Sequence, residues 1–194
     1  MFHLATLAGI ARAATQDAAA QVAGRKRIFS TGNAPAAALD VQVQQVVGEV
    51  SALSYAAEAT AIRAAFAAQR AYDAHWQADA ALEKQANIEA ELESAQGQVV
   101  VSELVLRATT LIFNALGASA ASTSKSLDRH WRNARTVASH NPLIYKARII
   151  GDWHINGSEP PYVWQIGSGP GKAAAQAQAE TLSQVPAKPA QQAA

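Results

Sequence analysis

Long stretches of the chain repeat alanine and aliphatic residues at intervals of three and four, the spacing that lines one face of an α-helix. Alanine supplies much of the 49% of residues that are hydrophobic, so we expect a core built mostly from small side chains. Alanine has the highest helix propensity and lets neighbouring helices approach closely. A chain of 194 residues is long enough for one domain with a hydrophobic core and short for two domains.

Glycine, proline and serine clusters divide this pattern into five expected helices. They cover Phe2 to about Lys26, Asp40 to Tyr72, about Leu82 to Leu116, Ser126 to about Val137, and Leu143 to Ile150. Asp40 is a suitable N-cap, and Gly151 is expected to end the last helix. Short connections between long helices predict an all-α, antiparallel four-helix bundle with a short extra C-terminal helix. Residues 1–167 form this domain, and the Ala/Gln/Pro-rich residues 168–194 are expected to be a disordered tail.

The periodicity also predicts which side chains are buried. The second helix should bury Val43, Val46, Val50, Leu53, Ala57 and Ala61. The third should bury Val100, Leu104, Ala108, Leu111 and Ala115, and the fourth Leu127, Trp131, Ala134 and Ala138. Gly48 costs its helix about 1 kcal/mol, which is tolerable if a neighbouring helix packs closely there.

Charge and composition exclude several classes of function. The net charge of +1 gives no general argument for nucleic acid. The absence of cysteine excludes disulfides, thiolate metal ligands and thiol catalysis, and no metal-ligand pair or phosphate-binding glycine loop is present. We find no secretory signal and no stretch of the apolar length that spans a bilayer. The expectation is a cytoplasmic protein with neither a membrane nor a nucleic-acid partner and without a metal.

Three groups of residues are candidates for chemistry. Arg129, Arg132 and Arg135 either form a solvated helix face or recognise an anion, since guanidinium groups suit phosphate. The run 25–27 at a helix end has the same two interpretations, because the helix dipole alone favours cations there. The pair 140–141 is the most suggestive, because Pro142 forces an irregular backbone just before it and such breaks present side chains to ligands. His3 and His75 are expected to be incidental surface residues, and His154 to be structural or solvated.

Five motifs stand out along the chain: LDRHWRNART at 127–136, SHNP at 139–142, LAGIA at 7–11, VQQVVG at 43–48 and GAS at 117–119. Together they resemble the C-terminal domain of the acyl-CoA dehydrogenase superfamily. Within the superfamily the sequence is similar to the flavin-dependent monooxygenases of the dibenzothiophene monooxygenase and sulfur-acquisition type. The resemblance covers about residues 2–164.

In that family the helical bundle forms the core of a homotetramer, and the flavin lies between the bundle and a β-domain. The resemblance therefore implies that this chain is one wall of an active site, either a truncated product or half of a split protein that lacks its N-terminal and β-domain half. A flavin reductase is the implied partner that supplies reduced FMN, with FAD as the other candidate cofactor.

The same resemblance assigns flavin-contacting residues. Lys26 takes the place of the arginine in the family's arginine–x–x–phenylalanine contact, with Arg25 and Arg27 beside it and Phe29 at its end. Gln45 matches a glutamine that contacts the flavin from a neighbouring subunit, and Arg132 aligns with the arginine of an arginine–aspartate–alanine–lysine run in the dehydrogenases.

His140 and Asn141 are the implied catalytic residues. Asn141 falls where many dehydrogenases carry a catalytic glutamate, and an amide cannot accept the α-proton that dehydrogenation requires. His140 would hydrogen-bond or protonate a flavin hydroperoxide in a monooxygenase that oxygenates sulfur or another soft nucleophile. The alternatives are an acyl-CoA dehydrogenase proper, with Asp128 or Asp152 supplying the carboxylate, and a non-catalytic helical scaffold for oligomerisation.

Overall fold

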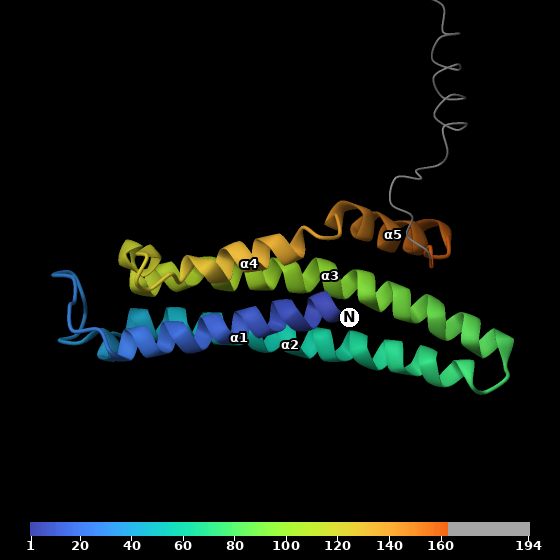
Figure 1. Cartoon of the computed structure of the whole chain (residues 1–194), viewed down its shortest axis with the longest axis horizontal. Coiled ribbons are helices and arrows are strands. Elements are labelled where there is room, and N and C mark those ends of the chain that lie inside the picture. The colour runs from blue at the N-terminus through green and yellow to red at the C-terminus, as the bar shows by residue number, and fades with distance from the viewer. Residues whose placement is uncertain (163–194) are drawn as a thin grey trace, which may run out of the picture. The chain divides into compact units, whose positions relative to one another are not determined.

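The computed structural model describes residues 1–162, and within them every regular element is helical (Figure 1). The elements are α1 (Phe2–Ala23), η1 (Ala37–Leu39), α2 (Val41–His75), α3 (Ala80–Leu116), η2 (Ala118–Ala121), α4 (Asp128–Ala138) and α5 (Leu143–Asn156). The helices belong to one compact unit, Met1–Pro160. The predicted tail at 168–194, and the predicted boundary before it, lie outside the described residues.

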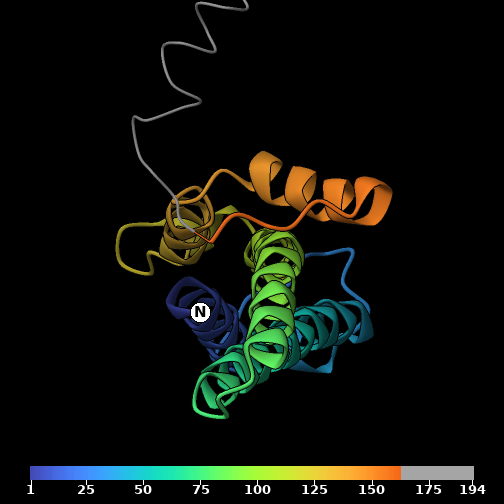
Figure 2. The same ribbon diagram turned by 90° about the vertical axis from the view of Figure 1, so that its right-hand side faces the viewer.

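Helices α1 to α4 form the predicted bundle. Helix α1 packs against α2, α3 and α4, while α3 packs against α1, α2, α4 and α5. The end-on view shows the first four helices gathered together and α5 outside them, beside α3 (Figure 2). The all-α fold with an extra C-terminal helix is confirmed.

Aspartates fix the starts of the two longest helices. Asp40 accepts a hydrogen bond from the backbone N–H of Gln42 at 2.9 Å, so its predicted role as the N-cap of α2 is confirmed. A further backbone hydrogen bond, from Asn33, is the main cause of its lowered pKa. Asp79 caps α3 in the same way, accepting from the N–H groups of Ala81 and Leu82 at 3.0 Å.

The core is lined by small side chains, as the composition predicted. In α2, Val50, Ala57 and Ala61 are buried as predicted, and the other three predicted positions are partly buried. The predicted stripe of α3 is wrong at Val100, which is 43% exposed. The neighbouring position, Val101, is buried instead, because three consecutive valines fit the helical period equally well and only the packing selects among them.

Glycines account for two further corrections. Helix α5 does not end at Gly151 but continues to Asn156, and Gly157 ends it in the left-handed region at φ +70°. A Cβ placed at Gly48 would meet nothing within 4 Å, so no close helix packing explains this glycine. The close approach occurs at Gly97 of α3, where a Cβ would lie 3.1 Å from Cδ1 of Leu4.

Helix α3 also corrects an expectation about membranes. By length and composition alone it is apolar enough to cross a bilayer, although no such stretch was expected. Core helices of globular proteins pass the same test, and α3 packs against four other helices. Its central place in the bundle explains the buried part of the apolar window, which is 44% of it.

Candidate functional site

The basic residues near the end of α1 line a groove of about 810 Å³, which we call the basic pocket. Its walls come from the segment 24–29, from the turn that follows α3, and from one side chain ahead of α4. The cations among the lining residues are Arg25, Lys26, Arg27 and Lys125, and none of the lining residues is acidic. Two segments about ninety residues apart in the sequence therefore combine into one positively charged site.

Arg25 anchors the basic pocket to the bundle. Its Nη1 donates to the carbonyl oxygen of Ala115 at 3.0 Å, and its guanidinium lies 5.4 Å from the ring centre of Phe29. Lys26 and Arg27 are exposed beside it. Gly117, with φ +70°, turns the chain sharply at the end of α3 and so brings residues 117–119 into the pocket wall. The structure thus brings together four of the predicted flavin contacts and the predicted loop.

The second candidate site lies where α4 ends. The predicted break at 140–141 is confirmed, because α4 stops at Ala138 and α5 begins after Pro142. Nδ1 of His140 lies 3.2 Å from Oδ1 of Asn141, and Nδ2 of Asn141 donates to Oε1 of Gln98 at 3.2 Å. The imidazole itself is exposed.

His3 belongs to this second site, although the sequence pattern assigned it no role. Its ring centre lies 4.3 Å from that of His140, with the rings inclined at 38°. Burial lowers the pKa of His3, and the positive charge that His140 can carry lowers it further. The sequence could have indicated this contact, because antiparallel packing of the first and fourth helices places the start of the first, with His3, beside the end of the fourth, with His140.

The two candidate sites lie at opposite ends of α1. His3 is in its first turn and Arg25 follows its last, so at 1.5 Å per residue they are roughly 30 Å apart. Gln45 is exposed near the start of α2, and Arg132 pairs with Asp128 at 3.0 Å on the outer face of α4. Within residues 1–162, no polar contact joins either of them to the basic pocket or to His140.

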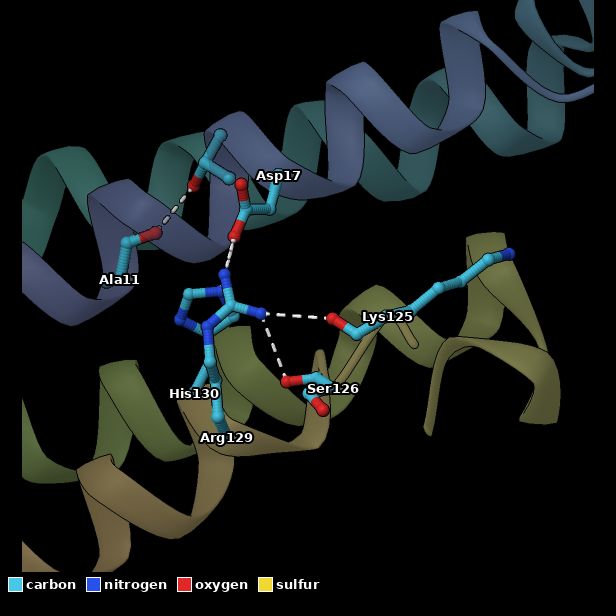
Figure 3. A network of polar contacts seen from close by, with 7 residues as sticks. Ala11, Asp17, Lys125, Ser126, Arg129 and His130 are labelled. Carbon is cyan, nitrogen blue, oxygen red and sulfur yellow. Dashed lines mark hydrogen bonds and ion pairs between the residues drawn. The ribbon is translucent and has the colours of Figure 1, made fainter. Parts of the chain in front are cut away.

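A polar clamp ties α4 to α1 between the two sites (Figure 3). Oδ2 of Asp17 accepts from Arg129, and it lies 2.8 Å from Nε2 of His130, whose side chain is only 7% exposed. Arg129 also donates to the carbonyl oxygens of Lys125 and Ser126, at 3.2 and 3.0 Å. This arrangement corrects the predicted packing of α4, in which Trp131 was expected to be buried but is 43% exposed.

Comparison with known proteins identifies the fold. Residues 1–143 match the family described as acyl-CoA dehydrogenase, C-terminal domain, which is well over half of the chain. The chain belongs to this family. The resemblance inferred from the sequence motifs is therefore confirmed.

Its relatives include three monooxygenases. The chain is 31% identical over 159 residues to the probable FMNH2-dependent monooxygenase SfnC of Pseudomonas putida, covering 81% of this chain and 39% of that protein. Among solved structures, the dibenzothiophene monooxygenase TdsC of Paenibacillus sp. A11-2 has a TM-score of 0.68 at 31% identity, covering 81% of this chain and 39% of TdsC. Methanesulfinate monooxygenase MsuC of Pseudomonas fluorescens has a TM-score of 0.69 at 27% identity, covering 81% and 40%. The chain thus spans about two fifths of the length of these relatives.

Proposed function

We propose that this chain forms the helical wall of a reduced-FMN-dependent monooxygenase that oxygenates a sulfur atom or another soft nucleophile. The observation that carries the proposal is a histidine–asparagine pair, without a carboxylate, at the break after α4. Dehydrogenation of an acyl thioester needs a base such as a carboxylate at its site. A histidine can donate or accept a hydrogen bond near neutral pH and suits oxygenation.

The two carboxylates that could have served a dehydrogenase are engaged elsewhere. Asp128 pairs with Arg132, and Asp152 accepts from Nδ2 of Asn156 at 2.7 Å. Within the described residues neither contacts His140 or Asn141. The names of the relatives agree, since SfnC, TdsC and MsuC are all called monooxygenases. Acyl-CoA dehydrogenase activity and a purely structural role are therefore the weaker alternatives.

The basic pocket suits the phosphate group of FMN. Guanidinium and ammonium groups bind phosphate by charge-assisted hydrogen bonds, and the lining residues offer four cations with no competing carboxylate. One structure of the relative TdsC is described as FMN-bound. Bound reduced flavin supplies the electrons and the oxygen chemistry, while the chain's own residues position it and exclude water.

We also propose that two copies of the chain are needed to complete one site. The basic pocket and His140 are separated by roughly 30 Å along α1, farther than a single FMN reaches. An exposed apolar stripe on α2 supports self-association, and we call Tyr55, Ile62 and Phe66 the α2 stripe. These side chains line a groove of about 1010 Å³ and recur on one helix face. A homotetramer is the assembly we expect.

The remaining partners follow from the same proposal. A separate flavin reductase supplies reduced FMN, because the cofactor must be reduced before oxygen is consumed, and SfnC is itself described as FMNH2-dependent. The other wall of the site corresponds to the part of the relatives that this chain does not span. We place the enzyme in the cytoplasm, where reduced flavin is produced.

Fluorescence quenching of FMN by the purified chain tests the cofactor assignment. Replacing Lys26 and Arg27 together by alanine should weaken binding by about a hundredfold or more, since each charged hydrogen bond contributes about 1.5–3 kcal/mol. Arg12→Ala is the matched control, because Arg12 is an exposed cation on α1, paired with Glu58 outside the pocket. Equal affinities for the double variant and the control would contradict the assignment.

Two further measurements test the reaction and the assembly. With a flavin reductase, a polypeptide that supplies the other wall and ¹⁸O₂, an organic sulfide should gain labelled oxygen; peroxide release alone would refute the proposed reaction. In light scattering, Phe66→Glu should reduce the mass of the oligomer, whereas Ile155→Glu should not, because Ile155 is exposed on α5 away from the α2 stripe. A monomeric wild-type chain would refute the assembly.

A further inference from the structure

A series of hydrogen bonds through the amide side chains of Gln98 and Asn141 ends on His140 and determines which ring nitrogen of the imidazole carries the proton. Nε2 of Gln98 donates to Oγ of Ser94 at 3.5 Å, which leaves Oε1 of Gln98 to accept from Nδ2 of Asn141 at 3.2 Å. Asn141 therefore turns its Oδ1 toward Nδ1 of His140, at 3.2 Å. An amide oxygen only accepts hydrogen bonds, so Nδ1 of His140 must carry a proton.

The second ring nitrogen of His140 then has a fixed role. In a neutral imidazole with its proton on Nδ1, Nε2 holds a lone pair and accepts hydrogen bonds. Within residues 1–162, Nε2 of His140 has no hydrogen-bond partner, and the side chain is exposed. This nitrogen is available to a ligand that presents an O–H or N–H group.

His3 is electrostatically coupled to the same ring. With ring centres 4.3 Å apart, a positive charge on both imidazoles would be repulsive. The lowered pKa of His3 has burial as its first cause and His140 as its second, with the amino group of Met1 as a third, smaller one. From α3, Gln98 bonds Asn141 beside the pair, and Glu91 lies within electrostatic range of the amino group of Met1. Within residues 1–162, no carboxylate forms a hydrogen bond or an ion pair with either imidazole.

We propose that Gln98 and Asn141 are positioning residues that, in the neutral form of His140, hold its proton on Nδ1 and leave Nε2 as a hydrogen-bond acceptor. An aspartate at position 141 would instead favour the imidazolium. The asparagine in this chain therefore selects an accepting histidine. The use of Nε2 toward a flavin-bound ligand rests on the proposed function, but the tautomer does not.

Nitrogen-15 NMR of the imidazole rings in the labelled 194-residue chain tests the tautomer without flavin. At about pH 8, above the ordinary histidine pKa of about 6.5, the spectrum separates Nδ1–H from Nε2–H rings. His140→Gln assigns the signal. Nδ1–H is the expected form, whereas imidazole in water favours Nε2–H. An Nε2–H ring in the wild type would overturn the proposal. That result is expected if the amide groups of Gln98 and Asn141 were both rotated by 180°, with the hydroxyl of Ser94 donating to Gln98.

Variants of Gln98 separate positioning from simple packing. Gln98→Leu removes the acceptor for Asn141, so the His140 signal should shift toward Nε2–H. Gln98→Glu keeps an acceptor at the same place and should preserve Nδ1–H. Gln69→Leu is the control, since Gln69 donates to Asp73 on the exposed face of α2. Identical tautomers in the leucine and glutamate variants would contradict the relay.

The electrostatic coupling of His3 to His140 has its own readout. In His140→Gln the pKa of His3 should rise toward its ordinary value, whereas His75→Gln, which changes a histidine paired with Glu83, should leave it unchanged. An unchanged His3 titration in His140→Gln would refute this part. If the NMR shows the Nδ1–H form while FMN fails to bind the basic pocket, the proposed function fails and the inference stands. If FMN binds the basic pocket while the NMR shows the Nε2–H form, the inference fails and the proposed function stands.

Discussion

Removing the carboxylate of Asp17 should destabilise the bundle more than breaking an exposed ion pair between α1 and α2. In Asp17→Leu, Nε2 of His130 loses its hydrogen-bond partner while its side chain stays about nine-tenths buried. An unsatisfied buried polar group costs about 1–3 kcal/mol. The lost pair with Arg129, whose side chain is 41% exposed, adds about 0–1 kcal/mol. We therefore expect a loss of about 1–4 kcal/mol in the free energy of unfolding.

Glu58→Leu is the matched control for this prediction. It breaks the pair of Glu58 with Arg12, which spans 3.6 Å and has both side chains largely exposed, so it should cost about 0–1 kcal/mol. Urea unfolding followed by circular dichroism measures both free energies, and for a chain of this size the Asp17→Leu loss corresponds to a fall of roughly 2–16 °C in Tm.

A second variant tests the physical cause. If the cost arises from an unpaired imidazole, His130→Leu combined with Asp17→Leu should recover part of it, because replacing both partners by apolar groups leaves nothing unsatisfied. The reasoning is refuted if Asp17→Leu costs no more than Glu58→Leu. It is also refuted if the double variant is simply the sum of the two single losses.

Three other predictions use the same unfolding assay. Gly48→Ala should stabilise the protein by about 0.5–1 kcal/mol, whereas Gly97→Ala should gain nothing or lose stability, because its Cβ would meet a core side chain of α1 at 3.1 Å; equal gains would contradict this. Lys146→Met should cost about 1–3 kcal/mol in the free energy of unfolding, because it removes the side-chain cation next to Glu91, whose pKa is raised by burial. Adding Glu91→Leu should recover part of this loss, and no cost in the single variant would count against the pairing. Below about pH 6.5 the unfolded chain binds a proton on residue 3 that the folded chain does not, because folding lowers the pKa of His3. Stability therefore falls as the pH falls from about 6.5 to the lowered pKa of His3. His3→Gln should weaken this dependence, and an unchanged pH profile would rule it out.

Local signals in the sequence were enough for the helices and most of their ends. Asp40 precedes an apolar period and caps α2 as predicted, because capping depends only on neighbouring backbone groups. Gly151 failed as a helix end for a related reason. Glycine is compatible with a helix interior, and the left-handed turn that ends α5 belongs to the next glycine, Gly157.

Contacts between distant segments were out of reach. His130 is buried because Asp17 lies against it from another helix, and the helical period alone favoured the larger, apolar Trp131. His3 was treated as incidental because its importance depends on His140, which is distant in the sequence. The basic run at 25–27 was found from the sequence, whereas Lys125 enters the basic pocket only once α3 has folded back beside α1.

The placement of two half-sites at opposite ends of α1 has a genetic consequence. A chain damaged at His140 keeps its basic pocket, and a chain damaged at Lys26 and Arg27 keeps its histidine end. If each complete site takes one end from each of two copies, mixing the two defective chains in equal amounts should restore about a quarter of the sites. Two alleles that are inactive alone would then complement each other in one cell, although they affect the same polypeptide.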